Sequence, residues 1–462
     1  MIVSQPSFSG RIGFAQVDIT PPVGIYARNW GAAKHDIAEG IHRPLHARAL
    51  VLQSNDSDNF LVLASLDLGW WKTREDEWYV RGALLEKFGL DEANLLVSLT
   101  HTHAGPVFCR EDADKPGGHL IAGYLEQVRD ALITATRNAL STAQNATLEW
   151  ATGTCTLAQN RDLPDPHSER IVCGYRPNTP ADDTLLVGRV SDATGKTLCV
   201  LANYACHPTT LAHENRLISP DWLGAFYETI ATHTGAPSLF LQGASGELQP
   251  REAFIADTTI ADSQGRQFAY SVLSTLESML PPQTQLEYQG VTESGAPLAI
   301  WQRTPAEVST HLHARRTAVE LPLKDWPTAL EMEAERQACL DRALQERLTR
   351  KIRVRKTVGN GTTSSLPVWI WELGDALLIA QREECYSCFQ QELRRRFPDK
   401  AIIVINLTNG SCGYLPPAPL YELDIYQVWQ TPYAQGGAEK LLEAVAEELG
   451  REKTVDRKVT GL

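Results

Sequence analysis

Two histidines one residue apart, His101 and His103, lie in the stretch "SLTHTHAGP" between an apolar run and a Gly-Pro turn. Imidazoles bind metals and transfer protons, so this spacing suits a metal site or general acid/base catalysis. Residues i and i+2 of a strand point to the same side, so both imidazoles can reach one site at the end of "NLLVSLT". The spacing alone leaves two interpretations open: a metal or catalytic site, or two polar residues at a strand end.

A mononuclear zinc site needs three or more ligands from separated segments, commonly histidines together with a carboxylate. Candidate ligands lie at the ends of other apolar runs. His207 ends "LCVLANYACH", and Glu383 and Glu384 follow "ALLIAQR". Taken alone, each glutamate is more typical of a solvated helix start than of a ligand. A second histidine pair, His311 and His313, lacks the apolar lead-in and the Gly-Pro turn, so we expect it to face solvent.

Other classes of function find less support in the sequence. The stretch "LQGASGELQP" has neither the ending of a phosphate-binding loop nor the Gly-x-Ser-x-Gly pattern of a serine hydrolase. Acidic residues outnumber basic ones by 56 to 43, so nucleic acid is not an expected partner. No apolar run reaches the roughly 18 residues that span a bilayer. The N-terminus lacks a signal-peptide pattern and the nine cysteines are scattered, so we expect no membrane span and a cytoplasmic location.

One basic concentration stands out in this acidic chain. It is "RLTRKIRVRK", from Arg347 to Lys356, which follows the acid-rich helical pattern "ALEMEAERQACLDRALQE". We interpret it as a solvated helix face whose charges compensate the helix C-terminus, rather than as an anion-binding patch.

The elements that must position the candidate residues alternate along the chain. Continuous apolar runs at 59–69 and 93–99 are typical of strands that are covered on both faces. Amphipathic helical patterns separate such runs, at 73–90, 122–143, 221–235 and 262–280. This order predicts an α/β fold with mixed, partly parallel sheets flanked by helices.

The second part of the chain shows a different order of expected elements. Residues 284–323 indicate strands and loops, a long helix is expected over 327–350, and the last third returns strands to the same body. We therefore expect one α/β catalytic domain over residues 1–462, either undivided or built from two intimate halves at about 1–283 and 284–462.

Seven motifs occur in an order that belongs to one family. They are "VDITPPVG", "HTHAGP", "NRD", "NYACHPTTL", "GASGELQP", "GDALLIAQREECYS" and "NGSCGYLPPAPLYELDIYQ", spread from Gly13 to about Leu449. With them the chain resembles the neutral/alkaline non-lysosomal ceramidase family and its shorter bacterial relatives. The resemblance implies a neutral-ceramidase-like catalytic domain, and we expect a short form without the C-terminal immunoglobulin-like domain.

The resemblance also implies a metal site. Ceramidases hydrolyse the amide of an N-acyl sphingoid base with one Zn²⁺ ion held by two histidines, a glutamate and a tyrosine. Carried over onto this sequence, the ligands are His101, His207, Glu384 and Tyr414, with Glu383 as the alternative after a one-residue shift. The implied reaction is attack by a water molecule that the metal activates.

Three further residues receive catalytic roles from the resemblance. His103 would be the acid/base that protonates the departing nitrogen, and Tyr426 would donate a hydrogen bond to the oxyanion. Arg161 of "NRD" would orient a polar part of the substrate.

The departures from the family pattern concern the substrate. Arg382 and Glu383 stand where ceramidases have Pro-Gly before the glutamate ligand, and Gln249 stands where they have a serine. We therefore expect a zinc-dependent amidohydrolase of a small, soluble amide. The alternatives are a zinc-dependent esterase or lactonase, a true ceramidase, and a degenerate binding protein that retains the fold. The sequence leaves the oligomeric state open, including a homo-oligomer.

Overall fold

The apolar runs form the buried strands of a large mixed sheet. The computed structural model describes residues 1–55 and 59–459. The eight strands of this sheet are, in spatial order, β14 (Ser238–Gln242), β12 (Thr197–Tyr204), β11 (Thr184–Asp192), β7 (Gln144–Thr154), β2 (Ser7–Asp18), β4 (His46–Gln53), β5 (Phe60–Leu66) and β6 (Leu95–Leu99). The outermost pair at each edge is parallel and the inner pairs are antiparallel. The predicted fold class, with mixed and partly parallel sheets, is confirmed.

A second sheet lies face to face with the first. Its order is β18 (Leu312–Pro322), β19 (Thr363–Leu373), β20 (Ala376–Gln381) and β22 (Ala401–Ile405). Trp369 and Trp371 of β19 are fully buried among side chains of the large sheet, and their indole nitrogens donate to the carbonyls of Glu92 and Ala93. Residues on both sides of position 283 thus share one core, while the division into two halves stays a prediction.

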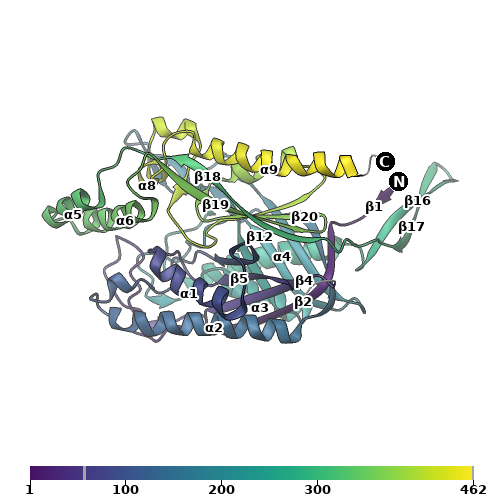
Figure 1. The fold of residues 1–462 in the computed structure, drawn as a ribbon, viewed down its shortest axis with the longest axis horizontal. Coiled ribbons are helices and arrows are strands. Elements are labelled where there is room, and N and C mark those ends of the chain that lie inside the picture. The colour runs from purple at the N-terminus through teal and green to yellow at the C-terminus, as the bar shows by residue number, and fades with distance from the viewer. Residues whose placement is uncertain (56–58, 460–462) are drawn as a thin grey trace.

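Helices cover the outer face of each sheet, which gives four layers (Figure 1). On the large sheet lie α1 (Arg74–Phe88), α2 (Ile121–Thr142), α3 (Leu223–Thr234) and α4 (Thr258–Ser278). On the small sheet lie α7 (Ser387–Arg396) and α9 (Gly437–Val459). Each helix buries one apolar stripe, as amphipathic helices on a sheet must.

The large sheet curls until its two edges meet. The hydroxyl of Ser65 in β5 donates to the carbonyl of Phe240 in β14 over 2.8 Å, although these strands lie near opposite ends of the strand order. The loop after β22 adds to this seam, because the side chain of Asn409 bonds the backbone of Leu95 and Val97 in β6. The ends of β6 and β12 are therefore brought to one region.

The helix expected over 327–350 is two helices. Helix α5 spans Ala329–Ala338 and α6 spans Arg342–Val358, between β18 and β19. The prediction of one helix is wrong because Asp341 caps a new helix, its carboxylate accepting from the Leu344 N–H at 2.8 Å. The basic run lies inside α6, and both helices project at one end of the molecule (Figure 1).

Short elements complete the fold. The strands are β1 (Ile2–Val3), β3 (Gly40–Ile41), β8 (Ala158–Asn160), β9 (Asp162–Pro164), β10 (Arg170–Cys173), β13 (Leu217–Ile218), β15 (Leu248–Pro250), β16 (Thr284–Glu293), β17 (Pro297–Pro305), β21 (Glu384–Cys385), β23 (Tyr414–Leu415) and β24 (Asp424–Ile425). The helices are α8 (Tyr426–Gln430) and the 3₁₀ turns η1 (Glu92–Asn94), η2 (Arg110–Asp112), η3 (Gly118–Leu120) and η4 (Ala418–Glu422). Across residues 1–55 and 59–459, no helix has the length and apolar character needed to cross a bilayer.

Two helical glycines allow a matched test of the packing between α3 and α4. A Cβ at Gly265 of α4 would lie 2.0 Å from the Trp222 carbonyl oxygen, whereas a Cβ at Gly123 of α2 meets nothing within 4 Å. We expect Gly265→Ala to lower the free energy of unfolding by about 1–3 kcal/mol, because the helices must separate. Gly123→Ala should raise it by about 0.5–1 kcal/mol. Urea denaturation followed by circular dichroism measures both, and a neutral Gly265→Ala would contradict the packing.

Candidate active site

The two histidines of the opening motif meet in a strained loop rather than on a strand. Strand β6 ends at Leu99, and His101 has a φ of 71°, a left-handed conformation that is rare outside glycine. Backbone bonds hold it there, since the N–H groups of Thr100 and His101 donate to Leu66 and Leu68. The Nε2 atoms of His101 and His103 lie 3.3 Å apart. The rings therefore share one site, but the predicted strand alternation is not the cause.

Backbone carbonyls orient His101 and His207. The Nδ1–H of His101 donates to the Gly69 carbonyl and the Nδ1–H of His207 to the Leu248 carbonyl, each over 3.0 Å. In the neutral form of each ring, the single proton lies on Nδ1 in this bond and the Nε2 lone pair is free. This is the arrangement in which histidines bind metals.

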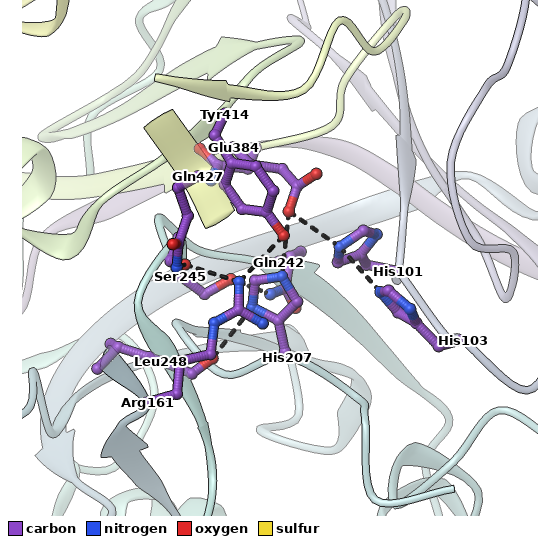
Figure 2. Close-up of polar contacts among 12 residues, drawn as sticks. His101, His103, Arg161, His207, Gln242, Ser245, Leu248, Glu384, Tyr414 and Gln427 are labelled. Atoms are coloured by element: carbon purple, nitrogen blue, oxygen red, sulfur yellow. Dashed lines mark hydrogen bonds and ion pairs between the residues drawn. The ribbon is translucent and has the colours of Figure 1, made fainter. Parts of the chain in front are cut away.

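The carboxylate that faces these histidines belongs to Glu384. Its Oε2 lies 3.2 Å from the His101 Nε2 and 3.1 Å from the His207 Nε2 (Figure 2). Glu383 instead accepts from the Tyr433 hydroxyl at 2.7 Å and from the Arg382 guanidinium. Both glutamates are buried, so their interpretation as solvated helix-start residues is wrong.

Burial and neighbouring charges shift the pKa values of the histidines and of Glu384 at this site. Burial and the Arg161 guanidinium lower the pKa of His207 to about 3, and burial and the two other histidines lower that of His103 well below its ordinary value. Burial opposes ionisation of Glu384, but the adjoining imidazoles hold its pKa well below the usual range. At neutral pH, the unprotonated His207 ring therefore faces an ionised carboxylate. Ligand atoms of His101, His103 and His207 all lie within 4.8 Å of one another, so the group can hold a metal ion.

Tyr414 lies beside the glutamate because strands β21 and β23 pair in parallel, with Glu384 opposite Tyr414. Its hydroxyl accepts a hydrogen bond from Arg161 over 3.0 Å, and Arg161 also donates to the Gly246 carbonyl over 2.7 Å (Figure 2). Burial, reinforced by Glu384, raises the pKa of Tyr414 well above its usual range, so the phenol stays protonated. The Arg161 Nε finds no hydrogen-bond partner among the residues that the structure describes.

Tyr426 is the first residue of α8 and lies next to Tyr414. The two phenol rings are 5.6 Å apart, measured between centroids. The Tyr426 hydroxyl accepts a hydrogen bond from Arg350 over 2.6 Å, which leaves its own proton available to donate. All seven residues with predicted roles thus lie in one connected cluster, from His103 to Tyr426.

Three neighbours of this cluster escaped the sequence reasoning. The Trp70 and Trp30 rings lie 4.9 Å and 5.1 Å from the His103 ring, and Arg350 bonds Tyr426. Trp70 follows the apolar run of β5 closely, so its place at a strand end was a usable signal. Arg350 belongs to the basic run, whose interpretation as a solvated helix face is wrong at this residue.

The second histidine pair behaves as expected. His311 and His313 are exposed, and both lie near the Glu372 carboxylate rather than in the cluster. Identical spacing therefore gives a surface pair in one place and a buried site in the other.

Comparisons with known proteins agree with these motifs. Residues 11–238 match the family described as neutral/alkaline non-lysosomal ceramidase, N-terminal. The neutral ceramidase of Pseudomonas aeruginosa is 26% identical over 259 residues, covering 52% of this chain and 37% of that protein. The neutral ceramidase of Mycobacterium tuberculosis is 28% identical over 242 residues, covering 46% of this chain and 36% of that protein. The matched region thus spans little more than a third of either relative.

Solved structures show the same fold over a longer range. A structure described as "Ceramidase complexed with C2" superposes with a TM-score of 0.68 at 16% identity, over 96% of this chain and 74% of the other. The crystal structure of the neutral ceramidase from Pseudomonas aeruginosa gives the same TM-score and coverage at 17% identity. The solved structures show a shared fold, and the family match over residues 11–238 with the two sequence relatives confirms the resemblance to the neutral/alkaline non-lysosomal ceramidase family that the motifs indicated.

Proposed function

We propose that this chain is a zinc-dependent hydrolase that adds water across an amide bond. The observation that carries the proposal is the convergence of the His101 and His207 Nε2 atoms on the Glu384 carboxylate, within 3.2 Å. A cation among these three groups would be held by all of them, and imidazole with carboxylate suits zinc. An amide is supported by the relatives named neutral ceramidase, because ceramide is the amide of a fatty acid with an amino alcohol.

The chain offers four groups to hold the ion: His101, His207, Glu384 and Tyr414. The backbone carbonyls that accept from the histidine Nδ1–H groups would keep both rings in place, and Arg161 would do the same for the Tyr414 hydroxyl. A bound zinc ion would supply Lewis-acid activation of a water molecule and of the scissile carbonyl.

His103 is placed to move the proton. It is neutral at pH 7 and only partly buried, and its ring lies between Trp30 and Trp70. Its free nitrogen would accept a proton as the water oxygen bonds the carbonyl carbon, and would return that proton to the nitrogen as the C–N bond breaks. The products are a carboxylic acid and an amine.

Tyr426 and Arg161 are assigned to the oxygen of the scissile carbonyl and to a polar group of the substrate. Burial raises the pKa of Tyr426, so its hydroxyl keeps the proton that an oxyanion would accept. Arg161 holds an unused Nε–H in a buried position, where a substrate oxygen would satisfy it.

The two adjacent glutamates test the metal ligands. We expect Glu384→Gln to weaken zinc binding by more than the about 10–100-fold that loss of an outer-shell partner costs. Glu383→Gln should keep the zinc but lower the melting temperature, because Tyr433 and Arg382 lose the buried side chain whose oxygen accepts from both. Elemental analysis after dialysis and thermal unfolding measure the two effects. Zinc lost from the Glu383 variant alone would reverse the ligand assignment.

His103 is tested by separating metal binding from turnover. We expect His103→Gln to lower kcat about 10²–10⁴-fold while zinc content stays at the wild-type level, because the ring transfers a proton and does not hold the ion. His313→Gln, in the exposed pair, is the matched control and should change neither quantity. Loss of zinc from the His103 variant would instead make this residue a third histidine ligand.

Matched amides and esters of short acyl groups test the reaction itself. We expect the zinc-loaded protein to hydrolyse the amides, a chelator to abolish the activity, and added zinc to restore it. The groups named above suit esters chemically as well, so each amide is assayed beside its ester. Cleavage of esters with silent amides would identify an esterase or lactonase, and zinc binding without turnover of either would identify a binding protein.

A further inference from the structure

Two basic side chains approach the same indole beside His103. The Arg350 guanidinium carbon lies 5.5 Å, and the Lys72 Nζ 5.4 Å, from the centroid of the Trp70 ring. That ring is in turn 4.9 Å from the His103 ring. Trp70 therefore lies next to both cations and to the residue that would protonate the departing nitrogen.

Neither cation has a carboxylate partner within the described part of the chain. The hydrogen-bond partner of Arg350 is the neutral Tyr426 hydroxyl, and no ion pair involves Lys72. One turn further along α6, by contrast, Arg353 pairs with Glu111 at 2.9 Å and with Asp112 at 2.8 Å. Within the basic run, Arg353 is therefore paired with carboxylates, whereas Arg350 bonds an uncharged hydroxyl.

This local charge opposes the character of the whole chain, whose formal net charge is −13. Arg350, Lys72 and Trp70 are all only partly exposed, so water screens the two cations less than it would on an open surface. Burial lowers the pKa of Lys72 to about 8, which leaves it mostly protonated at pH 7. The Asp112 carboxylate attracts the Lys72 charge, whereas Arg353 and Arg350 repel it, so an anion close to Lys72 and Arg350 would be attracted by both.

We propose that Arg350 and Lys72 bind a carboxylate on the amine side of the substrate, which makes the substrate an N-acyl amino acid. The inference rests on the proposed amide hydrolysis. The amine side is indicated because Trp70, which both cations approach, contacts His103, the group assigned to the departing nitrogen. A guanidinium fork with an ammonium group matches a carboxylate, whereas the uncharged amino alcohol of a ceramide would offer neither cation an ion-pair partner.

The test compares two amides that differ in one group. N-hexanoylglycine ends in a carboxylate where N-hexanoylethanolamine has a hydroxymethyl group. With the full, zinc-loaded chain we expect kcat/KM to be about tenfold or more higher for the glycine conjugate. N-ethyladipamic acid, which carries its carboxylate on the acyl side, is the third substrate and should be no better than the ethanolamine amide.

Variants connect this preference to the two cations. Lys72→Gln should lower the ratio of the glycine to the ethanolamine kcat/KM about tenfold, mostly through a higher KM for the glycine conjugate. Arg350→Gln should lower the same ratio, and Arg350→Lys should restore part of it. Lys356→Gln, on the same helix and bonded to Glu111, is the matched control and should leave the ratio unchanged.

Three results would overturn the proposal: equal kcat/KM for the first two amides, a preference for the acyl-side carboxylate, or a ratio that Lys72→Gln does not move. If no amide is cleaved, the proposed hydrolysis fails, and calorimetry still decides about the carboxylate site. Binding of N-hexanoylglycine about tenfold tighter than N-hexanoylethanolamine, and weaker in Lys72→Gln, would support the site. Equal binding of the two compounds would refute it.

Discussion

The structure is organised around one electrostatic constraint: the buried Glu384 carboxylate lies 3.1–3.2 Å from the Nε2 atoms of two histidines, of which burial leaves His207 unprotonated. A buried acceptor without a donor costs about 1–3 kcal/mol, so such an arrangement persists only where the surroundings impose it. The surroundings here do so from every side. Backbone carbonyls hold His101 and His207, backbone bonds hold His101 at a positive φ, and a two-residue strand holds Glu384 beside Tyr414. The strain is concentrated where a cation would relieve it.

The curled sheet is what brings these groups together. His101 follows an edge strand and His207 follows the strand next to the opposite edge, so a flat sheet of this order would keep them far apart. Curling closes the gap, and the bond between Ser65 and Phe240 marks the seam. Glu384 and Tyr414 then come from the second sheet layer, whose core is shared with the first. The site thus combines histidines that follow strands of the large sheet with Glu384 and Tyr414 from the second layer.

The segment between β18 and β19 places charged side chains of α6 near the site. Helix α6 pairs Arg353 with acidic groups near α1 and directs Arg350 to the hydroxyl of Tyr426. The site consequently combines one ionised carboxylate with several cations and a pair of indoles around His103.

Local patterns determined much of what the sequence could predict. Continuous apolar runs specified the buried strands, amphipathic runs specified α1 to α4, and the ordered motifs indicated the family and the residues of its site. Each of these signals is carried by neighbouring residues, as with the runs at 59–69 and 93–99. The missed break at Asp341 is also local, because a capping aspartate within an otherwise helical pattern was read as part of one helix.

Only the tertiary structure decided which side chains face the site. Glu383 and Glu384 are adjacent and chemically identical, and their opposite directions follow from the pairing of β21 with β23. The histidine pairs at 101 and 311 have the same spacing, and burial beneath a curled sheet separates a buried cluster from a surface pair. Arg350 became part of the site through a contact with Tyr426, 76 positions away. Such choices depend on strand pairing, sheet curvature and long-range contacts, which join residues that are far apart in the chain.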